Sequence, residues 1–198
     1  MKNEDVINEF KAAGAMLEGH FILSSGLHSP IYLQCARVLM DAARGERLCK
    51  ALAAKIKAAG YTFDAIVAPA MGGVVVGYEM GRQLGIPTMF CERVEGKFEL
   101  RRGFSLDQGA KILVVEDVVT TGKSSMEAVA CIDALGAKSV AVCSLIDRRG
   151  TNDVSLTLPL ISLLKLDVPT YKEEALPDAL KAIPASKPGS RFLKAKAG

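Results

Sequence analysis

The chain has 198 residues, of which 49% are hydrophobic and 24% charged, and its net charge is +3. This composition excludes a disordered chain and allows one domain with a substantial core. The mild positive charge gives no indication of nucleic-acid binding, although a local basic cluster can still hold a small anion.

The first part of the chain predicts helices on either side of a hairpin. Residues 3–13 form an expected helix capped by Asn3, and the acids there exclude the apolar core of a signal peptide. Residues 20–34 (HFILSSGLHSPIYLQ) indicate two short strands around a Ser/Gly/Pro turn. Leu48, Leu52 and Ile56 recur every four residues before Gly60, which predicts an amphipathic helix that starts near residue 41.

From residue 64 onward, apolar strands alternate with helices. The expected strands are 64–70, 86–92, 111–117, 138–147 and 154–164, and the expected helices are 72–85 and 124–136. Continuous apolar strands that alternate with helices predict an α/β fold with a mostly parallel central sheet flanked by helices. Ligands of such sheets bind beyond the carboxyl ends of the strands, so the residues that directly follow each strand are the candidate site.

Residues 92–109 (ERVEGKFELRRGFSLDQG) interrupt this alternation. Basic and acidic side chains are interleaved there with three glycines. The segment is polar and longer than most connections in α/β folds, which makes it a candidate mobile lid. A solvated β-hairpin with charge on both faces fits the same composition, and both interpretations stay open.

Five scattered cysteines, without a C-x-x-C pair, are typical of reduced thiols in a cytoplasmic protein. The longest uncharged run, 65–78, contains Pro69 and is shorter than the roughly 20 residues that span a bilayer. We therefore expect a cytoplasmic protein with no membrane segment.

Residues 116–125 (EDVVTTGKSS) contain Gly-Lys-Ser after a strand, which suggests a P-loop. A P-loop requires glycine five positions before the glycine of that triplet, but Asp117 stands there and would repel a triphosphate. The turn at 120–124 instead opens a helix whose N–H groups suit a monophosphate. Glu116 and Asp117 can accept hydrogen bonds from sugar hydroxyls, so the motif predicts a ribose 5-phosphate site. A capped helix start beside two solvated acids is the alternative.

EDVVTTGKS, preceded by four β-forming residues, resembles the signature of enzymes that use phosphoribosyl pyrophosphate (PRPP). Four further stretches, in order and spacing, resemble the orotate phosphoribosyltransferases: GHFILSSGLHSPIYLQ, APAMGGVVVGYEMGRQLG, CERVEGKFELRRGF and LIDR. The resemblance covers roughly residues 10–165. It implies one type I phosphoribosyltransferase domain over 1–198, with a hood from about residues 1–40 plus the C-terminal tail and a lid at about 92–109.

The resemblance also implies an activity and its requirements. The 5-phosphoribosyl group would pass from PRPP to orotate, forming orotidine 5′-phosphate and pyrophosphate in UMP biosynthesis. Mg²⁺ would be held mainly by PRPP, without a dedicated protein metal site. The expected assembly is a homodimer whose lid reaches the neighbouring subunit. A phosphoribosyltransferase for uracil or a purine, and a PRPP-sensing regulator that binds nucleic acid, are the alternatives.

Site residues follow from the same resemblance. The residues implied to bind PRPP are Met71, Gly72, Arg93, Lys97, Arg101, Glu116, Asp117, Val118, Val119, Thr120, Thr121, Gly122, Lys123 and Ser124. Arg93, Lys97 and Asp117 among them are implied to be catalytic. The residues implied to bind orotate are Ser24, Tyr32, Leu33, Thr120 and Arg148.

Two positions depart from the family pattern. Many orotate enzymes have lysine where this chain has Ser24 and Gly72, which removes two cations near the substrates. For Arg148, an ion pair with Asp147 or Asp153 at the surface is the alternative to a role in substrate binding.

Overall fold

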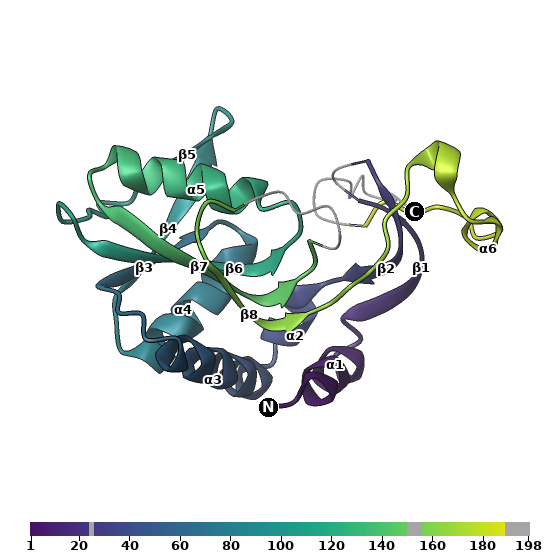
Figure 1. Cartoon of the computed structure of the whole chain (residues 1–198), viewed down its shortest axis with the longest axis horizontal. Coiled ribbons are helices and arrows are strands. Elements are labelled where there is room, and N and C mark those ends of the chain that lie inside the picture. The colour runs from purple at the N-terminus through teal and green to yellow at the C-terminus, as the bar shows by residue number, and fades with distance from the viewer. Residues whose placement is uncertain (24–25, 150–155, 189–198) are drawn as a thin grey trace, which may run out of the picture.

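The computed structural model describes residues 1–23, 26–149 and 156–188, which form two sheets with helices around them (Figure 1). The larger sheet has six strands in the order β5-β4-β3-β6-β7-β8. Its strands are β3 (Ala65–Pro69), β4 (Thr88–Val94), β5 (Lys97–Leu100), β6 (Lys111–Val119), β7 (Lys138–Asp147) and β8 (Leu160–Lys165). All neighbours pair in parallel except β4 and β5, which form an antiparallel hairpin at one edge.

Helices cover both faces of this sheet (Figure 1). On one face lie α2 (Cys35–Leu39), α3 (Ala42–Ala58) and α4 (Gly72–Leu84), with α1 (Asn3–Ala12) beside them; on the other lies α5 (Lys123–Ala134). Alternate residues of β6 serve two cores, because Leu113 and Val115 pack toward α3 and α4 whereas Ile112 and Val114 pack toward α5. This double burial explains why the strand is continuously apolar.

The chain reverses its direction of travel across the sheet between β3 and β6. From β3 it crosses through α4 to β4 on one side, and from β6 through α5 to β7 on the other. The carboxyl ends of β3 and β6 therefore diverge into two loops with a crevice between them, where ligands of open α/β sheets bind.

The smaller sheet pairs β1 (Met16–Ile22) with β2 (His28–Leu33) and lies to one side of the main sheet (Figure 1). The C-terminal segment, with the 3₁₀ helix η1 (Glu173–Ala175) and α6 (Asp178–Lys181), closes against it. His20 Nε2 and His28 Nδ1 lie 2.6 Å apart, and His20 Nδ1 bonds the carbonyl of Ile183 at 2.9 Å. The first contact lies within the hairpin, and the second joins the tail to it.

The predicted α/β fold is confirmed, and most predicted elements lie within a few residues of the observed ones. Helix α1 begins at Asn3 itself instead of being capped by it; the Asp5 carboxylate accepts the Lys2 N–H at 2.8 Å. The predicted last strand covered 154–164; residues 154 and 155 lie outside the described residues, and 156–159 are not strand, so β8 begins only at Leu160, after Pro159. Within the described ranges no helix is long and apolar enough to cross a membrane.

Candidate active site

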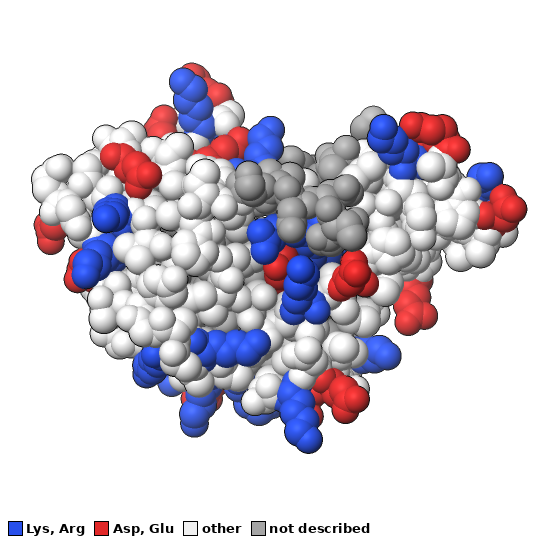
Figure 2. Space-filling model, viewed as in Figure 1, with Lys and Arg blue, Asp and Glu red and all other residues white. Residues whose placement is uncertain are grey.

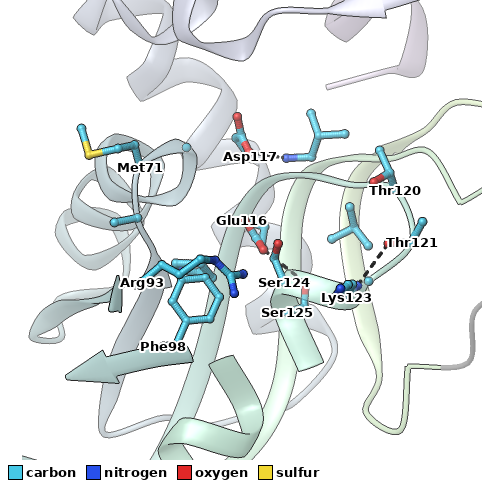
Figure 3. Close-up of a pocket in the computed structure, with 16 residues that line it drawn as sticks. Met71, Arg93, Phe98, Glu116, Asp117, Thr120, Thr121, Lys123, Ser124 and Ser125 are labelled. Carbon is cyan, nitrogen blue, oxygen red and sulfur yellow. Dashed lines mark hydrogen bonds between the residues drawn. The ribbon is translucent and has the colours of Figure 1, made fainter. Parts of the chain in front are cut away.

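A pocket opens at the crevice between β3 and β6. Its lining residues come from the β3–α4 loop, the β4–β5 hairpin, the end of β6 and the start of α5: Pro69, Ala70, Met71, Gly72, Arg93, Phe98 and residues 116–125. Arg93 and Phe98 lie on one side and Thr120, Thr121 and Lys123 on the other, with Glu116 between them (Figure 3). Twelve of the fourteen residues that the resemblance implies to bind PRPP are thus brought together, all except Lys97 and Arg101.

The turn before α5 has the form of an anion site. Gly122, at the N-cap, has φ +73°, and a Cβ there would lie 2.6 Å from Leu156, so only glycine fits. The Thr121 hydroxyl accepts the Lys123 N–H at 3.3 Å, and the Met126 N–H donates to the Gly122 carbonyl at 2.9 Å. The N–H groups of Ser124 and Ser125 belong to the first turn of α5, which supplies them no helical partner, and lie at its positive end. Lys123 points outward, with its side chain 81% exposed. Backbone amides and hydroxyls are therefore the main phosphate ligands that this turn offers.

The two acids at the end of β6 face opposite sides of the sheet. Glu116 is buried and accepts a 3.5 Å hydrogen bond from Ser125 of α5, whereas Asp117 lies against Gly72 of α4. Burial, then the charge of Asp117, raises the pKa of Glu116 to about 8, although the Ser125 hydroxyl lowers it. With this pKa, Glu116 can hold a proton at neutral pH in the substrate-free protein and can then donate a hydrogen bond as well as accept one.

Asp117 is the more accessible acid. Burial raises its pKa, and hydrogen bonds from the N–H groups of Val118 and of Asp117 itself lower it. Its Oδ1 accepts the Val118 N–H at 2.8 Å, which holds the carboxylate at the rim of the pocket (Figure 3). Asp117 is therefore placed to accept hydrogen bonds from the hydroxyls of a sugar.

Gly72 and Gly73 allow α4 to approach β6 closely. A Cβ on Gly72 would lie 2.9 Å from Asp117 Oδ1, and one on Gly73 would lie 2.8 Å from the carbonyl oxygen of Val115. Neither glycine has a positive φ, so close approach and not an unusual torsion explains them. A lysine at position 72, which the family resemblance led us to expect, would displace Asp117 from the place it has here. The peptide bond between Ala70 and Met71 in the same loop is cis.

We expect Gly72→Ala to raise the KM for PRPP about tenfold, because the new methyl group displaces the Asp117 carboxylate and weakens a charged hydrogen bond. Steady-state kinetics with varied PRPP would measure this, and thermal melting would report whether the fold is retained. Gly45→Ala is the matched control, since a Cβ there lies 3.7 Å from Leu39, an ordinary contact. An unchanged KM in Gly72→Ala would mean that the position of Asp117 is unimportant.

Arg93 is held over the pocket by three contacts. Its guanidinium lies 4.3 Å from the centre of the Phe98 ring, Nη1 donates to the Gly96 carbonyl at 2.7 Å, and Nη2 donates to Glu127 at 2.5 Å. Glu127, on α5, was not among the predicted site residues, because nothing in the sequence connects it with Arg93. The other N–H groups of Arg93 remain available for an anion.

The predicted lid segment begins as a regular β-hairpin. Arg93 pairs with Phe98 across it and Val94 with Lys97, so strand alternation places Lys97 on the opposite face from Arg93. Lys97 and Arg101 are exposed and do not line the pocket. Residues 92–100 thus form a hairpin, but it is not solvated on both faces, because Cys91 and Phe98 are buried on the face that Arg93 shares. The structure does not bring Lys97 or Arg101 to the site within one chain.

The residues expected to bind orotate are only partly assembled around the pocket. Thr120 lines it. Tyr32 does not line it; burial, and then the charge of Asp117, raises the pKa of Tyr32. Leu33 follows Tyr32 on β2, so its side chain points to the opposite face of the strand and packs in the core. Ser24 lies outside the described residues.

Arg148 follows β7 and is buried. Its Nη2 donates to the Ser29 hydroxyl and, at 2.9 Å, to the carbonyl of Ile31 on β2. The ion pair with Asp147 that the sequence left open does not form, since Asp147 pairs with Arg149 at 2.9 Å; the other alternative partner, residue 153, lies outside the described ranges. Arg148 thus lies between the hairpin and the main sheet.

Comparisons with known proteins agree with this site. Residues 39–165 match the model of the phosphoribosyl transferase domain. The chain is 56% identical to the orotate phosphoribosyltransferase of Rhizorhabdus wittichii, over 96% of this chain and 97% of that protein. It is 51% identical to the orotate phosphoribosyltransferase of Caulobacter vibrioides, over 98% of this chain and 100% of the relative.

Solved structures support the fold. The crystal structure of orotate phosphoribosyltransferase from Aeropyrum pernix aligns with a TM-score of 0.67 and 23% identity over 81% of this chain and 93% of that one. Leishmania donovani UMP synthase aligns with a TM-score of 0.72 and 19% identity over 84% of this chain and 37% of that one. From the matched domain and the near-complete relatives, the chain belongs to the orotate phosphoribosyltransferases, a family of type I phosphoribosyltransferases.

Proposed function

We propose that the protein transfers the 5-phosphoribosyl group from PRPP to orotate, forming orotidine 5′-phosphate and pyrophosphate in pyrimidine nucleotide biosynthesis. The observation that carries this proposal is the ribose 5-phosphate geometry of the pocket, an amide-lined turn beside Asp117. The 51–56% identity to orotate phosphoribosyltransferases along almost the whole chain supports orotate as the base.

In the proposed reaction the bond from the anomeric carbon to pyrophosphate breaks as orotate N1 forms its bond to that carbon. Residues 120–124 bind the 5′-phosphate, and Asp117 accepts hydrogen bonds from the ribose hydroxyls and stabilises the positive charge that develops on the sugar. Arg93 faces the departing pyrophosphate across the pocket and stabilises its negative charge. Because the leaving group is already good, catalysis rests mainly on positioning and on these charges.

Mg²⁺ fits the residues that are present. Among the described residues no group of three His, Cys, Asp or Glu could hold a metal. Mg²⁺ commonly keeps its waters and binds one or two carboxylates together with substrate phosphates, and Asp117 supplies a carboxylate at the pocket. When bound with PRPP, the ion would neutralise pyrophosphate charge.

We further propose a homodimer. The side chains of Met71, Val75 and Tyr78 are 84%, 53% and 70% exposed and follow one another at i, i+4 and i+7, from the N-cap of α4 into the helix. An exposed apolar stripe of this kind suits an isologous contact with a second copy. Met71 also lines the pocket, so such a contact would bring the partner close to the site. Lys97 and Arg101, which do not reach the pocket of their own chain, would then serve the neighbouring one.

Mixed dimers test this arrangement. Lys97→Ala and Asp117→Asn subunits, each inactive alone, should regain activity when co-expressed, because one site of the mixed dimer then has both native residues. Mixed dimers of Arg93→Ala with Asp117→Asn are the control and should stay inactive, since Arg93 and Asp117 line the same pocket within one chain. If the mixed dimers of Lys97→Ala with Asp117→Asn stayed inactive, Lys97 would serve the active site of its own chain or neither active site of the dimer.

A base panel tests the function itself. Incubation with PRPP, Mg²⁺ and one base at a time should consume orotate, measured by ultraviolet absorbance, and leave uracil and purines unchanged. Turnover of another base would support the alternative enzyme, and no turnover with any base would support a PRPP sensor. Positive and negative side chains are interspersed among the described residues on the face in Figure 2, which gives no support to a nucleic-acid surface there. The five free cysteines suit the reducing cytoplasm as its location.

A further inference from the structure

Arg148 is a buried cation without a charged partner. It is 7% exposed, and in the part of the chain that the structure describes no carboxylate forms an ion pair with it. Burial lowers the pKa of its guanidinium. Its Nε–H is buried and has no hydrogen-bond partner among the described residues. A buried charge left uncompensated is costly, so this arrangement indicates a place for an anion that a ligand brings.

The backbone of Arg148 lies next to the phosphate-binding turn. Its N–H donates to the carbonyl of Val119 at 2.8 Å, and Val119 immediately precedes Thr120. From there the side chain crosses to the hairpin, where Nη2 bonds Ser29 and Ile31. Arg148 therefore links the site on the main sheet to the smaller sheet.

Ser29 is the one side chain of the described residues that bonds the Arg148 guanidinium. It is fully buried, its hydroxyl donates to the Ile31 carbonyl at 2.9 Å, and the same oxygen accepts the Ile31 N–H at 3.2 Å. A serine hydroxyl has one donor and two acceptor positions, so these bonds and the one from Arg148 use all three. The proton of Ser29 points to Ile31, which leaves a lone pair directed at Arg148.

Strand β2 is itself held in place around Ser29. His28 exchanges backbone hydrogen bonds with Tyr171 at 2.8 and 2.9 Å, and its ring is bonded to His20. Ser29 is therefore a fixed point against which the long arginine side chain can be oriented.

We propose that Ser29 is a positioning residue that holds Arg148 so that its free N–H groups meet the carboxylate of the pyrimidine. This proposal rests on the proposed function, in which Arg148 binds orotate. Ser29 does not touch the substrate; it fixes one end of the guanidinium and leaves Nε–H for the ligand. A base without a carboxylate gives the buried Arg148 no charged partner. Ser29 and Arg148 together therefore favour binding of orotate over uracil.

The test compares two nucleotides that differ only in the carboxylate, orotidine 5′-monophosphate and UMP. In calorimetric titrations, Ser29→Ala should weaken binding of orotidine 5′-monophosphate about tenfold, as expected for one hydrogen bond to a charged group, and leave UMP binding unchanged. The KM for orotate should rise by a similar factor while the KM for PRPP stays constant. In an Arg148→Ala background, Ser29→Ala should have no further effect on the preference between the two nucleotides.

Ser144→Ala is the matched control. Ser144 is also fully buried and donates to a carbonyl two residues ahead, that of Ile146, at 3.0 Å, but it does not contact Arg148. Equal weakening of both nucleotides by Ser29→Ala, or the same pattern in Ser144→Ala, would overturn the proposal. Ser29→Cys, which keeps the volume but weakens the acceptor, should show the same selective loss if Ser29→Ala does not fold. A wild-type protein that binds both nucleotides equally would refute the role of Arg148 itself, independently of Ser29.

Discussion

Replacing Arg93 with alanine will lower kcat about 100-fold, the usual effect of removing one preorganised donor from a developing charge. The KM for orotate should change little, because Arg93 lies on the side of the pocket away from Arg148 and the hairpin of β1 and β2. Steady-state kinetics with both substrates varied would measure the two parameters separately. The expected loss is in kcat because the charge on pyrophosphate grows as its bond to the sugar breaks.

The contacts of Arg93 explain why it can act without reorganisation. The Phe98 ring, the Gly96 carbonyl and Glu127 fix the guanidinium before substrate arrives, and only two of its N–H groups are used. Arg47→Ala is a suitable control, since Arg47 pairs with Glu9 at 2.9 Å between α1 and α3, away from the pocket. If Arg93→Ala raised the KM for PRPP and left kcat unchanged, Arg93 would contribute equally to ground-state and transition-state binding.

The parts of the fold that could be predicted from the sequence are those where local pattern and burial agree. The helix before Gly85 and the strand at 138–147 were predicted almost to the residue, and the strand after Gly85 within two residues at each end, because apolar runs there end at glycines or charged residues. The start of β8 was missed because Pro159 lies inside an apolar run and cannot donate to a neighbouring strand. The five-residue α2 is too short to show a helical period.

The candidate site also has parts that the sequence predicts and parts that depend on tertiary packing. The phosphate-binding turn and its two acids are contiguous in sequence, so their chemistry could be inferred from residue types alone. The bond from Arg93 to Glu127 spans 34 residues and that from Arg148 to Ser29 spans 119, and both depend on how distant elements pack. The protonation of Glu116 has the same origin, since it depends on burial and on Asp117, which faces the other side of the sheet.

The second large effect is expected for Glu116→Gln, because the wild-type side chain holds a proton in the folded protein. At alkaline pH this variant should have a higher free energy of unfolding than the wild type. Burial raises the pKa of Glu116 from 4.5 to about 8. Between these values the folded protein holds a proton that the unfolded chain has lost, so the free energy of unfolding falls as pH rises through this window. At pH 9 the glutamine variant should exceed the wild type by on the order of 3 kcal/mol, with little difference at pH 4.

Urea unfolding from pH 4 to 9 would measure the effect. The wild type should lose stability above pH 5, whereas the glutamine variant, which has no proton to lose, should lack this part of the fall. Glu173→Gln replaces an exposed glutamate on η1 and should follow the wild-type curve. If Glu116→Gln also followed that curve, Glu116 would ionise in the folded protein as it does in the unfolded chain. Glu116 lines the pocket, where the proposed function places it beside the sugar, so the added stability should be accompanied by lower turnover; that result would indicate that Glu116 is kept for function at a cost in stability.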